Sequence, residues 1–94
     1  MERTRDAKYD SHLRVEAHHL RHDLVGSREI YGFIAFDDSD HVALLETVPA
    51  TSRPDAEKRF ALRLFERQMA GQVGSVLGRI DYDLAWKDLS DLDE

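Results

Sequence analysis

The chain has 94 residues, of which 41% are hydrophobic, and 13 Lys and Arg against 19 Asp and Glu give a net charge of -6. This length fits one globular domain, and no apolar run approaches the ~20 residues that span a bilayer, so we expect no membrane association. Because cysteine is absent, disulfides, zinc fingers and thiol catalysis are excluded, and the composition fits a reducing, cytoplasmic location.

The negative charge is concentrated at one end of the chain. Residues 80–94 hold six acidic side chains against one lysine, or -5, whereas residues 1–79 hold 13 acidic and 12 basic side chains, or -1. Charge segregated in this way is typical of an interaction tail or of a solvated chain end. A nearly neutral body therefore carries an acidic C-terminal segment.

The chain begins with a polar segment of mixed charge, so we expect residues 1–10 to form a flexible N-terminus before a single α+β domain over residues 11–94. Residues 11–24 carry two competing patterns. The first is the strand-like alternation of Leu13, Val15 and Ala17. The second has helical spacing and comprises Tyr9, Leu13, Ala17, Leu20 and Leu24. With Ser11 suited to an N-cap and Gly26 beyond the end, we predict a helix.

Two apolar runs follow, over residues 29–36 and 41–48, and Pro49 closes the second. The acidic cluster between them, Asp37, Asp38 and Asp40, is typical of a turn, so we predict an antiparallel hairpin. A calcium loop is excluded because it needs glycine and glutamate where this sequence has two valines.

Residues 54–70 give the clearest helical pattern, with Pro54 in the first turn and an end near Gly71. Its apolar residues are predicted to cover a broad buried arc against the hairpin. They are Phe60, Ala61, Leu62, Leu64, Phe65 and Met69.

The C-terminal segment is ambiguous. Ile80, Tyr82, Leu84 and Trp86 alternate as in a strand, but the spacing also fits a helical face, and we favour a short helix. The predicted architecture is therefore an α-β-β-α core, with the hairpin packed on helix 54–70, and then a short C-terminal helix or strand.

Catalytic and metal-binding patterns are missing from the sequence. Its five histidines include His18 and His22, which would share a helical face, but no HExxH motif occurs, so we expect neither a metal nor a cofactor. The sequence also has no nucleophile elbow and no phosphate-binding loop, and we expect no enzymatic activity.

Two groups of residues are candidates for binding. Arg59, Arg63 and Arg67 would line one helix face and contact phosphates or a partner's carboxylates, with Glu66 close enough to pair with Arg63. The second group surrounds the single tryptophan of the acidic segment. It comprises Tyr82, Trp86, Asp81, Asp83 and Asp88.

These patterns lead to one main functional hypothesis and one alternative. The main hypothesis is a small, acidic, non-enzymatic protein-binding module, an adaptor or inhibitor that docks on a basic protein surface through Trp86 and segment 80–94. The alternative is a nucleic-acid-associated regulator that uses the three arginines, although the net charge disfavours it unless the acids mimic DNA. We also expect a homodimer, formed through an open hairpin edge or through the face of helix residues 60–69.

Overall fold

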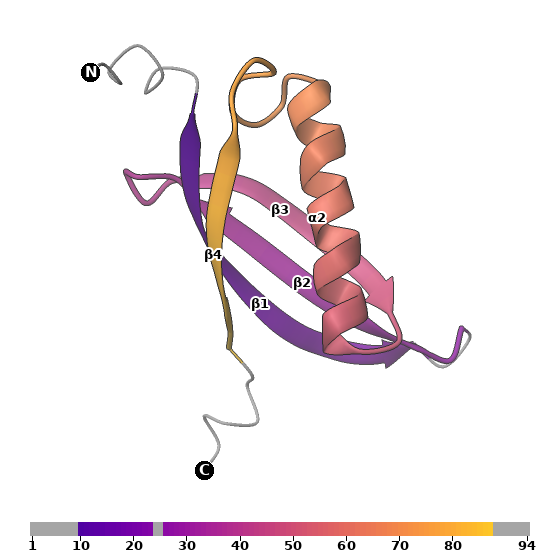
Figure 1. Ribbon diagram of the computed structural model, residues 1–94. Helices are drawn as coiled ribbons and strands as arrows, with labels where there is room; N and C mark the ends of the chain where they lie inside the picture. The colour runs from indigo at the N-terminus through magenta and orange to yellow at the C-terminus, as the bar shows by residue number, and fades with distance from the viewer. Residues whose placement is uncertain (1–9, 24–25, 88–94) are drawn as a thin grey trace.

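The computed structural model describes residues 10–23 and 26–87. In chain order the elements are β1 (Ser11–Asp23), β2 (Arg28–Phe36), β3 (Val42–Ala50), α2 (Arg53–Met69) and β4 (Ile80–Trp86). One helix lies across one face of a four-stranded sheet, as Figure 1 shows. The α+β class is therefore confirmed, whereas the order of elements differs from the predicted α-β-β-α. Most of the predicted flexible N-terminus, residues 1–9, lies outside the described residues.

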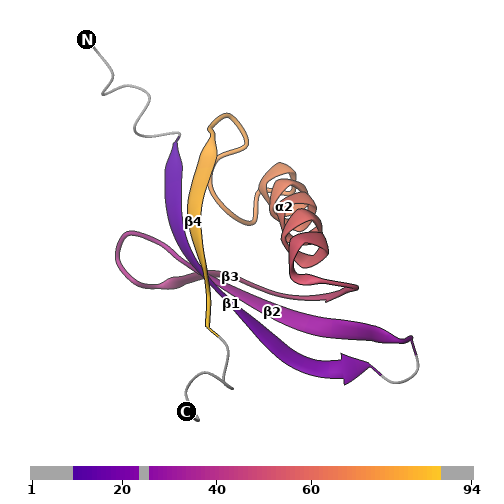
Figure 2. The ribbon, with the colours of Figure 1, turned by 60° about the horizontal axis from the view of Figure 1, so that its bottom comes forward.

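The strand order in the sheet is β3-β2-β1-β4. β1, β2 and β3 form an antiparallel meander, and the chain then crosses over through α2 so that β4 pairs parallel to β1. Figure 2 shows the twist of this sheet, with α2 on one side of it. The first and last strands of the chain are thus neighbours, and β3 and β4 are the sheet edges.

The predicted helix over residues 11–24 is wrong, because this segment is the strand β1. Leu13, Val15 and Ala17 are buried under α2 while the residues between them face outwards, so the alternating pattern was the informative one. Ser11 does not cap a helix; its N–H donates to the carbonyl of Arg79 at 3.0 Å. Burial against the rest of the fold outweighed local helix propensity here.

The predicted hairpin is confirmed as β2 and β3, which pair in antiparallel register. Asp37 shapes the turn, since its Oδ1 accepts hydrogen bonds from the N–H groups of Ser39 and His41 at 2.9 and 3.0 Å. Pro49 does not end the second strand, as was predicted, but lies inside β3. Proline is tolerated there because β3 is an edge strand, where one side of the backbone needs no ladder partner.

The predicted helix 54–70 is confirmed as α2, within one residue at each end. Ser52 is its N-cap and accepts a hydrogen bond from the N–H of Asp55, whose carboxylate in turn accepts the N–H of Thr51. Gly71 follows the C-cap with φ of 77°, a left-handed conformation that suits glycine. Reciprocal capping thus fixes the point where the chain leaves β3 and begins its crossover.

The core lies between α2 and the sheet, where Phe33 of β2 stacks on Phe60 of α2 with 4.5 Å between ring centroids. The predicted buried arc of the helix is only partly correct. Phe60 and Leu64 are buried, but the remaining four residues of that arc are exposed. They are Ala61, Leu62, Phe65 and Met69.

Residues 80–86 are also a strand, so the short helix favoured for this segment is wrong there, and residues 88–90 lie outside the described part of the chain. In β4 the side chains of Ile80, Tyr82, Leu84 and Trp86 pack against the core, and the residues between them are exposed. The extended form is selected because it completes the sheet beside β1. Within the described residues, no helix is long and apolar enough to cross a membrane.

Candidate functional site

Trp86 lies at the end of β4, near the start of α2, and its side chain is engaged within the molecule. Its Nε1 donates a 2.6 Å hydrogen bond to Glu57 of α2, and its ring meets those of Tyr31 and Phe33 edge-on at 5.4 and 5.8 Å. The guanidinium of Arg53 lies over the same ring, 4.8 Å from its centroid. These contacts fix the indole in the fold and leave little of it for a partner.

The other residues predicted around Trp86 do not form one surface with it. Tyr82 packs edge-on against Phe60, and burial raises the pKa of its hydroxyl. Asp81 and Asp83 alternate with these aromatics, so they project on the opposite side of the sheet. Asp88 lies outside the described residues. The aromatic and acidic parts of the predicted site are therefore separated by the sheet itself.

The arginines of α2 are held by carboxylates of the same chain. Arg63 donates to Oε1 of Glu46 at 3.0 Å, and Arg67 donates from Nε to Oε2 of the same side chain at 2.6 Å. Arg59 donates from Nε to Asp55 at 3.0 Å. The expected pair between Arg63 and Glu66 does not form, because Glu46 takes its place.

Glu46 was not singled out by the sequence, yet it organises this face of the helix. Its position in β3 turns it under α2, where it is 6% exposed. A glutamate at an inward position of an apolar strand, with arginines four residues apart on the next helix, was the signal that could have revealed it. The hydrogen bond to Glu46 raises the pKa of Arg67, as expected for a cation beside a buried anion.

Four histidines lie on β1 and His41 lies in the β2–β3 turn, and each lies within 4.0 Å of a carboxylate. In the strand, His18 and His22 no longer share a helical face. Instead a register shift after His19 brings His19 and His22 to the two carboxylate oxygens of Glu29, at 2.6 and 2.5 Å. No group of three or more metal-ligating side chains arranged for an ion occurs among the described residues.

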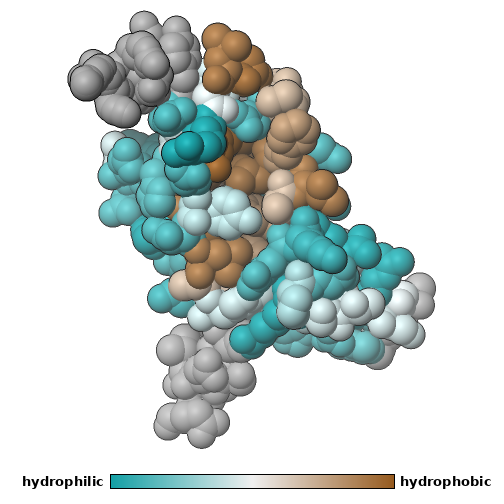
Figure 3. Space-filling model, viewed as in Figure 1, coloured by the Kyte–Doolittle hydropathy of each residue, from teal (hydrophilic) through white to brown (hydrophobic). Residues whose placement is uncertain are grey.

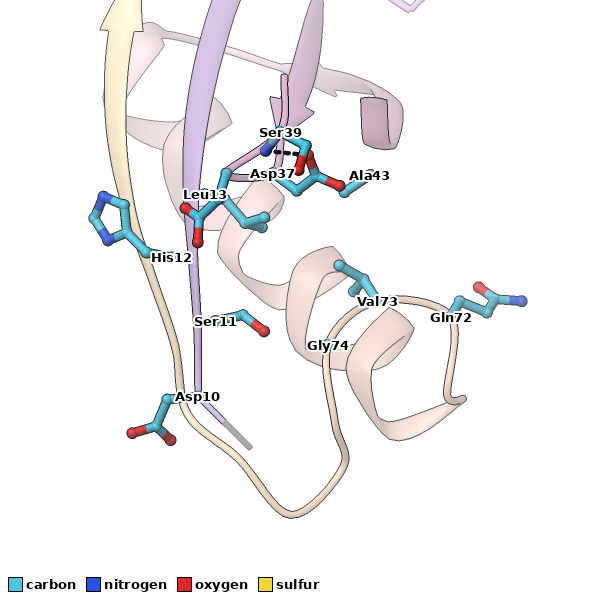
Figure 4. Close-up of a pocket in the computed structure, with 11 residues that line it drawn as sticks. Asp10, Ser11, His12, Leu13, Asp37, Ser39, Ala43, Gln72, Val73 and Gly74 are labelled. Atoms are coloured by element: carbon cyan, nitrogen blue, oxygen red, sulfur yellow. Dashed lines mark hydrogen bonds between the residues drawn. The ribbon is translucent and has the colours of Figure 1, made fainter. Parts of the chain in front are cut away.

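A hollow of about 400 Å³ lies between the start of β1, the β2–β3 turn and the loop after α2. Figure 4 shows Ser11 pointing into it, towards Gly74, while Asp10 and His12 point away. His12 instead contacts Asp83 of β4 at 3.0 Å. The polar groups of this hollow do not converge on a common point, so it has no arrangement suited to acid–base or nucleophilic chemistry.

A second apolar surface, which the helical pattern did not separate from the buried face, lies on the outer side of α2. Leu62, Phe65 and Met69 are 65%, 59% and 48% exposed, and their spacing of three and four residues places them on one helix face. We call these three residues the outer stripe. Figure 3 shows this apolar surface along α2 and over the loop that follows, where Val76 and Leu77 are also exposed.

The other exposed surfaces are less suited to a partner. On the outer face of the sheet, the guanidinium of Arg14 covers the ring of Phe36 at 4.4 Å and pairs with Glu16 and Asp40. The edge strand β3 carries Pro49 and the inward-pointing Glu46, two devices that discourage pairing with another strand. The outer stripe has no comparable protection.

Comparison with known proteins gives no family for this chain: no protein-family profile, no curated protein and no solved structure matches it.

Proposed function

We propose that this protein is a small, non-enzymatic protein-binding module whose contact surface is the outer face of α2. The observation that supports this is the outer stripe, which is apolar and exposed on the side of the helix opposite its buried residues. A surface helix of a monomeric domain normally has one apolar face and is polar on the other. An apolar second face is typical of a helix that is covered by a partner.

The surroundings of the stripe fit such a contact. Arg59, Glu66 and Lys58 border it, and their long side chains form the polar rim that surrounds the apolar centre of most interfaces. Phe65 is the largest apolar side chain of the stripe and is the natural anchor for a partner's pocket.

The contact through Trp86 and segment 80–94 is the weaker form of this proposal. The indole is occupied by Glu57 and Arg53, and the acidic residues of β4 project from the other side of the sheet. The nucleic-acid alternative has also lost its main support, since Arg59, Arg63 and Arg67 are ion-paired within the chain. No other observation favours it.

Capture of partners from an extract of the source cells tests the proposal. The immobilised wild-type chain is compared with Phe65→Lys, which places a charge in the stripe, and with Leu45→Lys, a matched change at an exposed leucine of the outer sheet face. We expect a protein retained by the wild type and by Leu45→Lys but lost with Phe65→Lys. Retention by both variants, or loss only with Leu45→Lys, would contradict a contact through α2.

A further inference from the structure

We infer that the occupant of the outer stripe is a second copy of this chain, with the two α2 helices packed antiparallel across a two-fold axis. This inference rests on the proposed function, because it names the partner for the same helix face. The argument comes from the spacing of apolar residues along the stripe and from the charges beside it.

The stripe has the spacing of a coiled-coil seam. Together with Lys58, its residues recur at intervals of four, three and four, which is the alternation of the a and d positions of a heptad. When two such seams face each other in antiparallel orientation, Leu62 of each copy packs against Phe65 of the other. The outer layers pair Met69 with Lys58, whose aliphatic stem covers the thioether while its ammonium stays in water.

The charges beside the seam select this orientation. Arg59 and Glu66 lie seven residues apart on one flank of the seam, because each directly follows a d position, Lys58 and Phe65 respectively. In an antiparallel pair the same flank of both helices meets, so Arg59 of each copy lies opposite Glu66 of the other. In a parallel pair each of these positions would instead face the opposite flank of the other helix, so Arg59 and Glu66 would lie opposite Pro54 and Ala61, which carry no charge.

Both charged groups have capacity for this contact. Arg59 is half exposed and uses only Nε for its bond to Asp55, and the carboxylate of Glu66 makes no hydrogen bond or ion pair with the rest of the described chain. Leu62, Arg59 and Glu66 line one shallow groove of about 160 Å³ between α2 and the edge of β3. The other flank presents Ala61, whose small side chain lets a second helix approach closely.

Sedimentation equilibrium of the purified chain tests the inference. Between about 10 and 500 μM we expect the average mass to rise from 10.8 kDa towards twice that value, as for a weak interface of limited area. Arg59→Glu and Glu66→Arg should each raise the dissociation constant about tenfold, and the double exchange should restore it. Arg28→Glu, which changes the charge equally on β2, is the control and should leave it unchanged.

The orientation is tested by cross-linking, which has no background because the chain contains no cysteine. Leu62→Cys and Phe65→Cys chains are mixed and oxidised, and the disulfide-linked species are identified by mass. With equal amounts of the two chains we expect the mixed 62–65 disulfide to exceed the sum of the two symmetric products, which random pairing would only equal, because those positions face each other only in the antiparallel pair. A predominance of symmetric 62–62 and 65–65 products would show a parallel pair and overturn the inference.

Failure of this inference can be told apart from failure of the proposed function. A chain that stays at 10.8 kDa over the whole range, or dimers that the charge variants leave unchanged, would overturn self-association through α2. The capture experiment with Phe65→Lys would still report whether a different protein occupies the stripe. Melting temperatures of all variants check that a lost dimer reflects the surface and not an unfolded chain.

Discussion

Arg67 of α2 donates a 2.6 Å hydrogen bond to Glu46 of β3, and so joins the helix to an edge strand through a carboxylate that is almost fully buried. Arg63 binds the second oxygen of the same carboxylate. A buried ion pair of this kind adds little stability compared with an apolar contact, but losing its cations leaves an uncompensated charge.

We therefore expect the double variant Arg63→Met and Arg67→Met to lower the free energy of unfolding by about 2–3 kcal/mol, since both arginines are partly exposed and water screens part of the loss. Adding Glu46→Met should recover most of that loss, because three apolar side chains then pack at the same place. Urea denaturation measures both effects. A triple variant no more stable than the double one would contradict this account.

Trp86 is predicted to support the fold more than the contact with a partner. Trp86→Phe keeps an aromatic ring but removes the hydrogen bond to Glu57, so we expect a loss of about 1–2 kcal/mol in the free energy of unfolding. Far-UV circular dichroism in urea measures it. The dissociation constant of the dimer should be unchanged. A tenfold increase in that constant would indicate that Trp86 belongs to the contact surface.

Glu29 gives the protein a defined sensitivity to acid. Hydrogen bonds from His22 and then His19 hold the pKa of this carboxyl below its ordinary value of 4.5. The folded state therefore binds the proton more weakly than the unfolded state, and the stabilisation is complete above pH 4.5 and is lost as pH falls through the folded-state pKa.

We expect Glu29→Gln to show a shallower fall in melting temperature than the wild type between about pH 5 and pH 3. Asp38→Asn, which removes an exposed carboxylate that makes no hydrogen bond or ion pair with the rest of the described chain, should follow the wild-type profile. Parallel profiles for the wild type and Glu29→Gln would mean that the two histidines do not stabilise this carboxylate.

Alanine substitutions at Gly71 and Gly74 can separate the cost of backbone strain from the cost of steric crowding. Both have positive φ, 77° and 62°, but a Cβ on Gly71 meets nothing within 4 Å, whereas on Gly74 it lies 3.0 Å from Ile80. We expect Gly71→Ala to cost about 1 kcal/mol and Gly74→Ala about 1 kcal/mol more, measured by urea denaturation. Equal losses would show that Ile80 moves aside freely.

The hairpin and the main helix were predictable because their signals are local. An aspartate-rich turn between two apolar runs, and a proline with acidic residues at the start of a helical pattern, each determine the structure without distant contacts. Residues 11–23 and 80–86 were misjudged because their strands exist only as neighbours of each other and of β2. No local signal shows that pairing.

The outer stripe was not separated from the buried face of the helix, for a different reason. On a helical wheel, Phe60 and Phe65 belong to one broad apolar arc, which was taken as a single buried face. The sheet covers only the side of α2 that carries Phe60. The rotation of the helix about its axis, which places Phe60 on that side, depends on the capping by Ser52 and on the contacts of Glu46. The sheet therefore decides which of the two apolar sides is buried, and the sequence pattern of the helix alone does not show this.

The parallel pairing of β1 with β4 also sets an order of assembly. The β1–β2–β3 meander closes only short loops, whereas β4 must join β1 across most of the chain, at a larger loss of chain entropy. We expect the meander to form early in the folding transition state and β4 to dock late. Weakening β4 should then chiefly accelerate unfolding, so the strand that ends at Trp86 governs how long a folded molecule lasts.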